Sequence, residues 1–231
     1  MSGHSKWSQI KRQKGANDQK RSGVFTKLSK NISIAAKKGK DPESNSALRS
    51  AIDAARAASM PKDGIEKAIL RGAGELPGQI IEEVVYEGYG PGGVAFIINC
   101  ITDNKNRSSA FIKSTLSKHG GSLGGPNTVA YLFKKRGVLR IENSNEDTQL
   151  KAIDAGAEDI KEEDNGLTVY VLPEKFEETK KIFDNLDYSS MEMVPENRLD
   201  VSSEIAEKLN KLLTELEEND DVNETYTNAD L

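Results

Sequence analysis

Cysteine and histidine are almost absent from this chain of 231 residues, which has one cysteine, Cys100, and two histidines, His4 and His119. A single thiol cannot form a disulfide bond within the chain, and it cannot build a cluster of several thiolates around a metal. Two histidines are too few for a histidine-rich zinc site. The composition therefore predicts no metal site and no cofactor, and it is typical of a protein of the reducing cytosol.

The sequence also lacks any apolar stretch near the roughly 20 residues that a membrane-spanning helix needs. The run at residues 94–98 is short and ends at Asn99, and the N-terminus has no apolar core of a secretory signal. Residues 1–40 contain a single acidic residue, Asp18, as a mitochondrial transit peptide would, but lysine outnumbers arginine there and a helical pattern follows without a break. We therefore expect a cytoplasmic protein with no membrane partner.

No combination of residues typical of an enzyme is visible in the sequence. The acidic runs at residues 162–164 and 217–218 fall in a loop and at a helix end, and no base or nucleophile stands near them. A solvated acidic surface explains both runs better than catalysis does. We predict that the protein is not an enzyme, has no catalytic residues and takes no small-molecule substrate.

Charge is unevenly distributed along the chain, although the net charge is only −5. Residues 1–72 hold 16 Lys and Arg against 6 Asp and Glu, and residues 73–141 hold 8 against 5. Residues 142–231 hold 8 against 26. Such asymmetry bears on the partners of a protein and not on its fold. It predicts a basic N-terminal part that attracts polyanions and an acidic C-terminal part.

Residues 17–72 have the apolar spacing of three helices. In the first, Phe25, Leu28, Ile32 and Ala35 follow one another at steps of three and four. A second helix is expected from an N-cap at residue 45 or 46 to the break at residues 60–61, and a third, short helix ends at residue 72. Helices this short are not stable alone, so we expect them to pack together as a helical domain of residues 1–78 with a flexible N-terminal arm.

After residue 77 the pattern changes to that of strands rich in Val, Ile, Phe and Tyr. We expect strands at residues 82–87 and 94–102, joined by a Gly-rich hairpin, then a helix from residue 103 or 104 to 119 and a strand at 129–133. A helix at residues 203–218 and a strand near 222–226 close the chain. These two would complete the sheet that residues 79–133 begin.

The intervening block has its own order of elements. It predicts a strand at 138–141, a helix at 147–155, strands at 158–162 and 167–172, a helix at 174–185 and a strand at 189–194. This βαββαβ order is the ferredoxin-like arrangement. We therefore predict an α+β protein of three domains: the N-terminal helical bundle, a discontinuous domain of residues 79–133 and 203–231, and an acidic domain of residues 134–202 inserted in it. Both α/β domains are expected to be ferredoxin-like.

Basic residues of the first predicted helix gather on one side. Lys20, Lys27, Lys30, Lys37 and Lys38 fall within a sector of roughly 100°, centred about 140° from the apolar stripe. Cations at helical spacing suit the phosphates of a nucleic acid, although a solvated lysine surface is the alternative. We expect this side to be exposed to solvent, so that reversing the charge of Lys27, Lys30 and Lys37 would leave the fold intact.

The arm at residues 4–16 is basic and nearly free of apolar residues, as segments that order on phosphate are. Its tryptophan either stacks on a base or docks on the helical domain. The candidate nucleic-acid-binding residues of the N-terminal part are Lys6, Trp7, Lys11, Arg12, Lys14, Lys20, Arg21, Lys27, Lys30, Lys37 and Lys38.

A second, smaller basic group, Lys105 and Arg107 with Lys113 and Lys118, lies on the helix after residue 104, next to a loop of amides and hydroxyls. Lys105 and Arg107 would contact phosphate or base edges, or would be ordinary exposed cations of a capped helix. The G-x-G-x-x-G pattern at residues 88–93 is followed by a strand instead of a helix, so a hairpin turn explains it better than a dinucleotide site.

Several motifs in combination resemble the YebC/PmpR family. They lie at residues 3–7, 10–12, 18–21, 48–52, 60–63, 86–95, 102–107, 117–124 and 219–228. The sequence departs from the family at Ser59, where Asn is more usual, and at residues 125–127. The resemblance implies a helical N-terminal domain and two α/β domains, the last inserted in the middle one. It also implies a nucleic-acid-binding regulator, because bacterial members are described as transcriptional regulators and mitochondrial relatives activate the translation of cytochrome c oxidase.

Together these observations predict a non-enzymatic, nucleic-acid-binding regulator of gene expression, in the first place a DNA-binding transcriptional regulator. One alternative is a translation factor that binds ribosomal or messenger RNA through the same cations. Another, of a different class, is a protein-interaction scaffold whose acidic domain binds basic partners.

Overall fold

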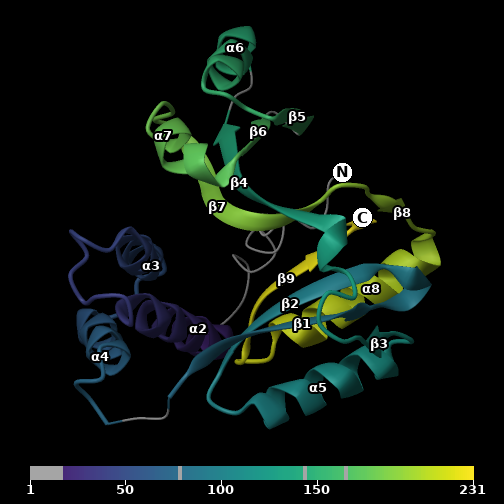
Figure 1. Cartoon of the computed structure of the whole chain (residues 1–231), viewed down its shortest axis with the longest axis horizontal. Helices are drawn as coiled ribbons and strands as arrows, with labels where there is room; N and C mark the ends of the chain where they lie inside the picture. Colours follow the sequence, from purple (N-terminus) through teal and green to yellow (C-terminus); the bar gives the residue numbers. More distant parts are fainter. Residues whose placement is uncertain (1–17, 78–79, 143–144, 164–165) are drawn as a thin grey trace.

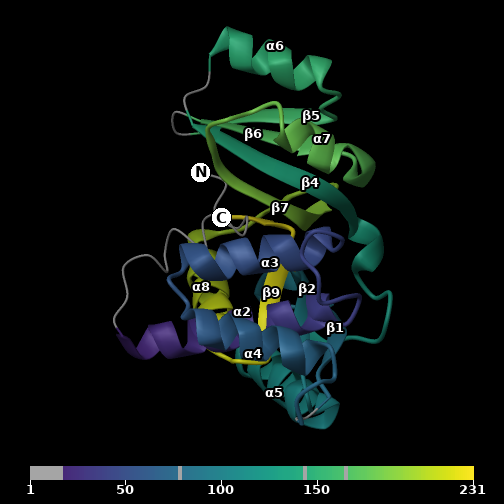
Figure 2. The same ribbon diagram turned by 90° about the vertical axis from the view of Figure 1, so that its left-hand side faces the viewer.

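The structure is a computed structural model that describes residues 18–77, 80–142, 145–163 and 166–231 (Figure 1). It is an α+β protein with three parts: the N-terminal helices, a first antiparallel sheet with α5 and α8, and a second antiparallel sheet with α6 and α7. In Figure 1 these lie at the left, at the lower right and at the top. Figure 2, turned by 90°, again shows the second sheet above the other two parts.

The N-terminal helices are α2 (Asp18–Ala36), α3 (Ser46–Ala57) and α4 (Lys62–Gly72), which confirms the three helices predicted from apolar spacing. The Asn45 side chain caps α3 by accepting from the Leu48 N–H, and its amide donates to the carbonyls of Ala35 and Gly39 at 2.9 and 2.7 Å. The core between the helices is built from Ile32, Ala36, Leu48, Ile52, Ala55, Ile65 and Ala68. The cap thus ties the end of α2 to the start of α3.

Helix α4 packs tightly on α2 at Gly72. A Cβ atom at this position would lie 2.2 Å from the Ser33 carbonyl oxygen and 2.8 Å from the Ala36 Cβ. We expect Gly72→Ala to force the two helices apart and to lower the free energy of unfolding by about 2–3 kcal/mol, as overpacking of a core does. Urea denaturation followed by circular dichroism measures the effect.

Gly64→Ala is the matched control in the same helix, because there a Cβ meets only the flexible end of Met60 at 3.0 Å. It should be neutral or stabilise the helix by up to about 1 kcal/mol. Equal unfolding curves for the two variants would show that the α2–α4 contact does not require glycine.

The first sheet consists of β1 (Glu82–Tyr89), β2 (Ala95–Thr102), β3 (Ser122–Leu123) and β9 (Val222–Thr227), in the order β3-β1-β2-β9. Helices α5 (Lys105–Lys118) and α8 (Ser203–Glu217) cover one face. Side chains of β2 such as Phe96 and Ile98 pack there against Ile112 of α5 and Leu212 of α8. The pairing of β9 with β2 shows that the end of the chain completes this sheet, as the sequence predicts.

Two predictions for the first sheet are wrong. Residues 129–133 do not form a strand of it: Ala130–Leu132 is a 3-10 helix, and β4 (Phe133–Glu142) begins at its end and belongs to the second sheet. The order β3-β1-β2-β9 is also not the ferredoxin-like order. The short Gly-rich loop after Tyr89 makes β1 and β2 direct antiparallel neighbours, so no third strand lies between them.

The carboxylate of Glu87 explains the course of the chain after β3. It is buried and accepts three backbone N–H bonds of 2.8 Å, from Asn127 to Oε1 and from Val129 and Ala130 to Oε2. A backbone whose N–H groups donate to one side chain in this way is not available to pair as a strand. The loop is therefore held in a turn by a residue about 40 positions earlier in the chain.

The second sheet consists of β4, β5 (Asp159–Glu163), β6 (Gly166–Val171) and β7 (Leu186–Pro195), in the order β5-β6-β4-β7 with antiparallel pairs. Helix α6 (Glu146–Asp154) connects β4 to β5, and α7 (Phe176–Lys180), after the 3-10 helix Pro173–Lys175, connects β6 to β7. Strand β6 thus separates β4 from β5, which is the split βαβ order expected for this block.

Helix α7 is shorter than the helix predicted for residues 174–185. After Lys180 the N–H groups of Lys181 and Ile182 bond to carbonyls three residues back, and this tighter turn ends the helix. Phe183 then fills the core of the second sheet from the loop.

The two sheets meet through an apolar cluster of Ala95, Ile97, Val129, Phe133 and Tyr226, on which Met193 of β7 packs. A short parallel pair is formed by β8 (Leu199–Asp200), which lies in the chain between β7 and α8, and β10 (Ala229–Asp230).

The domain boundaries after residues 78, 133 and 202 stay a prediction. Within the described ranges, no helix combines the length and apolar character needed to cross a membrane.

Candidate nucleic-acid interface

The structure describes six of the predicted nucleic-acid-binding side chains. Lys27, Lys30, Lys37 and Lys38 belong to α2 or the turn after it, and Lys105 and Arg107 lie in the first turn of α5. Lys20 and Arg21 lie in α2, but their side chains are outside the description. The arm residues Lys6, Trp7, Lys11, Arg12 and Lys14 lie outside the described residues altogether.

Lys30 and Arg107 bind the same carboxylate, that of Asp221 just before β9. The Lys30 Nζ donates to Oδ1 at 2.7 Å; Arg107 donates from Nε to Oδ2 at 3.0 Å and from Nη2 to Oδ2 and Oδ1 at 2.7 and 3.0 Å. The side chain of Asp221 is only 7% exposed. Burial alone would raise its pKa, but the hydrogen bonds from Lys30 and Arg107 outweigh it and hold the pKa below its usual value.

Lys27 contributes to the same contact one turn earlier in α2. Its ammonium donates to the carbonyl oxygen of Glu217 at the C-terminal end of α8, where the helix dipole is negative. Lys30 donates in addition to the Asp220 carbonyl at 2.9 Å. Burial lowers the pKa of Lys27, against the attraction of Glu217 and Asp220. We call the set Lys27, Lys30, Arg107 and Asp221 the latch.

The latch corrects the expectation that this side of α2 faces solvent. The side chains of Lys27 and Lys30 are partly buried, because the side of α2 opposite its apolar stripe meets the acidic end of α8. The structure does bring Lys30 and Arg107 together, but around a carboxylate of the same chain. The spacing of the sequence carried no signal for this, because Asp221 lies 191 positions after Lys30.

Lys37 and Lys105 lie at a second junction between α2 and the first sheet. The Lys37 ammonium donates to the carbonyl of Ile81, and the Lys105 Nζ lies 2.6 Å from the Glu82 carboxylate. This hydrogen bond and the charge of Lys105 lower the pKa of Glu82. Both lysines remain exposed, so these contacts are of the weak surface kind.

Three further cations of the N-terminal helices are exposed: Lys38, Lys67 and Arg71. The side chain of none of the three forms a hydrogen bond or ion pair with any residue that the structure describes. The ends of α2 and α4 lie close together, since Gly72 packs on Ser33 and Lys40 pairs with Glu75. Lys67 and Arg71 are not among the predicted residues, because they lie outside the strongly basic first 40 residues. The sequence signal that could have identified them is the excess of basic residues over the whole of residues 1–72.

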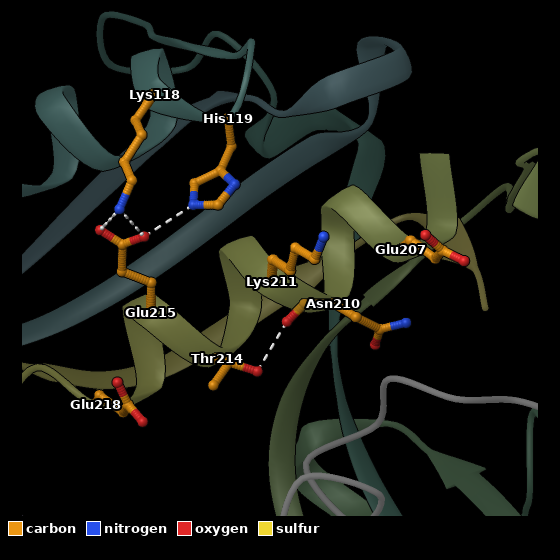
Figure 3. A pocket seen from close by; sticks show the side chains of 8 residues that line it. All are labelled: Lys118, His119, Glu207, Asn210, Lys211, Thr214, Glu215 and Glu218. Carbon is orange, nitrogen blue, oxygen red and sulfur yellow. Dashed lines mark hydrogen bonds and ion pairs between the residues drawn. The ribbon is translucent and has the colours of Figure 1, made fainter. Parts of the chain in front are cut away.

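A separate groove of about 690 Å³ lies between the end of α5 and α8 (Figure 3). In it the Glu215 carboxylate accepts from Lys118 at 3.0 and 2.9 Å and lies 2.8 Å from the His119 Nε2, which lowers the pKa of Glu215. The hydroxyl of Thr214 donates to the Asn210 carbonyl at 2.8 Å, within its own helix. Lys118, His119 and Glu215 are thus engaged with one another, and no local pattern of residues indicated the His119–Glu215 contact.

Metal ligation has no support in the part of the chain that the structure describes, where no three His, Cys, Asp or Glu residues are grouped to hold an ion. Cys100 is buried, and burial, together with the nearby Asp221 charge, raises the pKa of its thiol to about 12. A thiol with such a pKa is a poor nucleophile at neutral pH.

Comparison with known proteins gives matches along nearly the whole chain. A family model described as TACO1/YebC protein N-terminal domain matches residues 5–75, and one described as TACO1/YebC second and third domain matches residues 81–229. The chain is 48% identical over 240 residues to a protein of Dictyoglomus turgidum, covering 100% of this chain and 96% of that protein. It is 46% identical over 239 residues to one of Kosmotoga olearia, with 100% and 95% covered. Both relatives bear the name "Probable transcriptional regulatory protein".

A solved structure has the same fold. The crystal structure of a conserved hypothetical protein from Aquifex aeolicus superposes with a TM-score of 0.84 at 39% identity, covering 92% of this chain and 91% of that one. The likeness therefore extends over all three parts of the molecule. On these matches, the chain belongs to the TACO1/YebC family.

Proposed function

We propose that this protein is a non-enzymatic, DNA-binding regulator of transcription that uses its N-terminal part to bind the phosphate backbone. The observation that carries the proposal is the excess of cations in residues 1–72, of which Lys38, Lys67 and Arg71 are exposed and unpaired among the described residues. The names of the Dictyoglomus and Kosmotoga relatives support the same function. A cytoplasmic location belongs to this proposal.

The proposed interface joins the arm to the exposed ends of α2 and α4. Lys37, Lys105 and Arg107 are exposed and flank it, whereas Lys27 and Lys30 are engaged in the latch. Phosphate contacts of this kind fix the position on a nucleic acid without reading its sequence. The residues that extend the surface toward the N-terminus are Lys6, Trp7, Lys11, Arg12 and Lys14 of the arm, with Lys20 and Arg21.

The domain division is part of the proposal. Residues 1–78 would bind nucleic acid, residues 79–133 with 203–231 would form the central domain, and residues 134–202 would be an acidic, ferredoxin-like insertion. The strand order of the second sheet supports the last assignment. Because that insertion carries the opposite sign of charge, it would repel phosphate and favour one orientation on the ligand.

Neutralising Lys38, Lys67 and Arg71 together by glutamine is the first test. We expect the affinity for a duplex DNA to fall about 10- to 100-fold at low salt, and the slope of log K against log salt to become shallower by about 3, one for each lost phosphate contact. Fluorescence anisotropy of a labelled duplex, titrated between about 50 and 200 mM salt, measures both.

The control changes the same net charge elsewhere: Lys113→Gln, Lys151→Gln and Lys211→Gln, all exposed and outside the N-terminal helices. This variant should bind like the wild type. Equal losses in the two triple variants, or an affinity that does not respond to salt, would refute the assignment. The same titration with single-stranded RNA of equal length distinguishes a translation factor from a transcription factor.

A further inference from the structure

In the latch, one carboxylate binds two cations from different helices of the chain. We propose that the carboxylate of Asp221 occupies the place that a backbone phosphate takes between Lys30 and Arg107, and that a bound nucleic acid displaces it and releases the N-terminal helices from the first sheet. The inference rests on the proposed function, and it adds a competitor within the chain and a change of domain position.

The geometry at Asp221 is the geometry in which Arg and Lys bind phosphate. Arg107 presents Nε and Nη2 to the two carboxylate oxygens at 2.7–3.0 Å, and Lys30 adds a point charge at 2.7 Å. A planar guanidinium donates in the same fork to two oxygens of a carboxylate or of a phosphate. The cations come from two different parts of the molecule, α2 and α5, and Asp221 binds both of them, while Arg107 Nη2 donates in addition to Asp103 at 2.7 Å.

The site can be reached from solvent on the side of Arg107. The Arg107 side chain is 54% exposed, against 19% for Lys30 and 7% for Asp221. Lys105, which is 57% exposed, lies two residues before it on the same first turn of α5. An incoming polyanion therefore contacts Arg107 and Lys105 first. Lys30 can bind it once the Asp221 carboxylate has moved away from Lys30.

The other contacts between the N-terminal helices and the first sheet are polar, and they offer little resistance to the replacement of Asp221 by a phosphate. Among the described residues, the apolar cluster of the N-terminal helices runs from Leu28 to Ile69 and has no member from either sheet. The cluster of the first sheet likewise has none from α2, α3 or α4. Polar contacts of Lys27, Lys30 and Lys37 join the two parts. A partly buried ion pair of this kind has a small net free energy, because desolvation offsets most of the attraction.

The experiment follows the distance between the two parts while nucleic acid is added. Fluorophores are attached to cysteines introduced at the exposed positions Ser50 of α3 and Lys211 of α8, and energy transfer between them reports the separation. Cys100 does not interfere, because it is buried and the pKa of its thiol is about 12. The ligand probes are a duplex DNA, a single-stranded RNA and sodium polyphosphate.

Energy transfer in the wild type should fall when DNA or RNA binds. In Asp221→Asn it should be low before any ligand is added, and the affinity for nucleic acid should rise about fivefold or more, because the competitor is gone. Asp220→Asn is the matched control: it removes the same charge one residue away, yet Lys30 contacts only the backbone carbonyl of Asp220. It should change both measurements far less than Asp221→Asn does, because the Asp220 carboxylate only attracts Lys27 through its charge.

Lys30→Gln distinguishes the opening of the latch from the binding of nucleic acid. It removes a contact that closes the latch, so energy transfer should be low. It also removes a cation that would bind phosphate, so the affinity should not rise. Binding of nucleic acid by the wild type with unchanged energy transfer would overturn the proposal, as would equal affinities of Asp221→Asn and Asp220→Asn. If the wild type binds neither nucleic acid, the proposed function fails. Polyphosphate then tests the latch alone, and unchanged energy transfer with that polyanion overturns the inference.

Discussion

Replacing Lys27 and Lys30 together by glutamate is expected to lower the free energy of unfolding by about 3–5 kcal/mol, the cost of leaving a buried charge without its partner. The carboxylate introduced at position 30 would face the buried Asp221 carboxylate, and the one introduced at position 27 would face the Glu217 carbonyl at the negative end of α8. The N-terminal helices should separate from the first sheet. Urea denaturation and limited proteolysis between α4 and β1 measure the two effects.

The matched control reverses two charges of the same helices that have no partner among the described residues, Lys38→Glu with Lys67→Glu. Exposed substitutions of this kind change stability by about 0.5 kcal/mol or less. This control should lose nucleic-acid affinity and keep its stability, whereas the Lys27 and Lys30 variant should lose stability and the contact between the N-terminal helices and the first sheet. Coincident unfolding curves of the two double variants would contradict the role assigned to the latch.

Glu87→Gln is expected to have the second largest effect, a loss of about 3 kcal/mol at neutral pH, since a hydrogen bond to a charged group is worth about 1.5–3 kcal/mol. The Glu87 carboxylate accepts N–H bonds from Asn127, Val129 and Ala130. An amide in its place offers only one oxygen and turns a donor toward a backbone N–H. Thermal unfolding at pH 7 measures the loss.

The stability that Glu87 contributes depends on pH in a defined direction. Burial by itself would raise its pKa, but the bonds from Val129, Asn127 and Ala130 together lower the pKa below the usual 4.5. A carboxyl whose pKa is lower in the folded state stabilises the fold above its unfolded pKa and loses that contribution as the pH falls through the folded pKa. The stability difference between wild type and Glu87→Gln should therefore be constant near neutral pH and shrink below about pH 4.5.

Glu83→Gln is the control for both measurements, since Glu83 is an exposed carboxylate on the same strand. It should leave the unfolding temperature and its pH dependence close to those of the wild type. A difference between wild type and Glu87→Gln that persists unchanged at low pH would show that the side chain acts through its size and not through its charge.

Local signals were sufficient for most of the helices and strands. Apolar steps of three and four located α2, α3 and α4, and candidate cap residues marked the helix starts at Asn45 and Asn104. The helix and the strand predicted at the end of the chain belong to no other sheet, and this was enough to predict that β9 completes the first sheet. Where a long-range contact overrides the local pattern, the prediction was wrong, as at residues 129–133 under the influence of Glu87.

The sequence by itself determined the order of the elements and the uneven distribution of charge, because both depend on neighbouring residues or on composition. Only the tertiary structure decided which cations are free. Lys27 and Lys30 look like Lys38 in the sequence, yet the first two meet the end of α8, some 190 positions away, and the third faces solvent. The physical reason is that an ion pair depends on the positions of both charges in space, and the spacing of residues along a helix specifies only one of them.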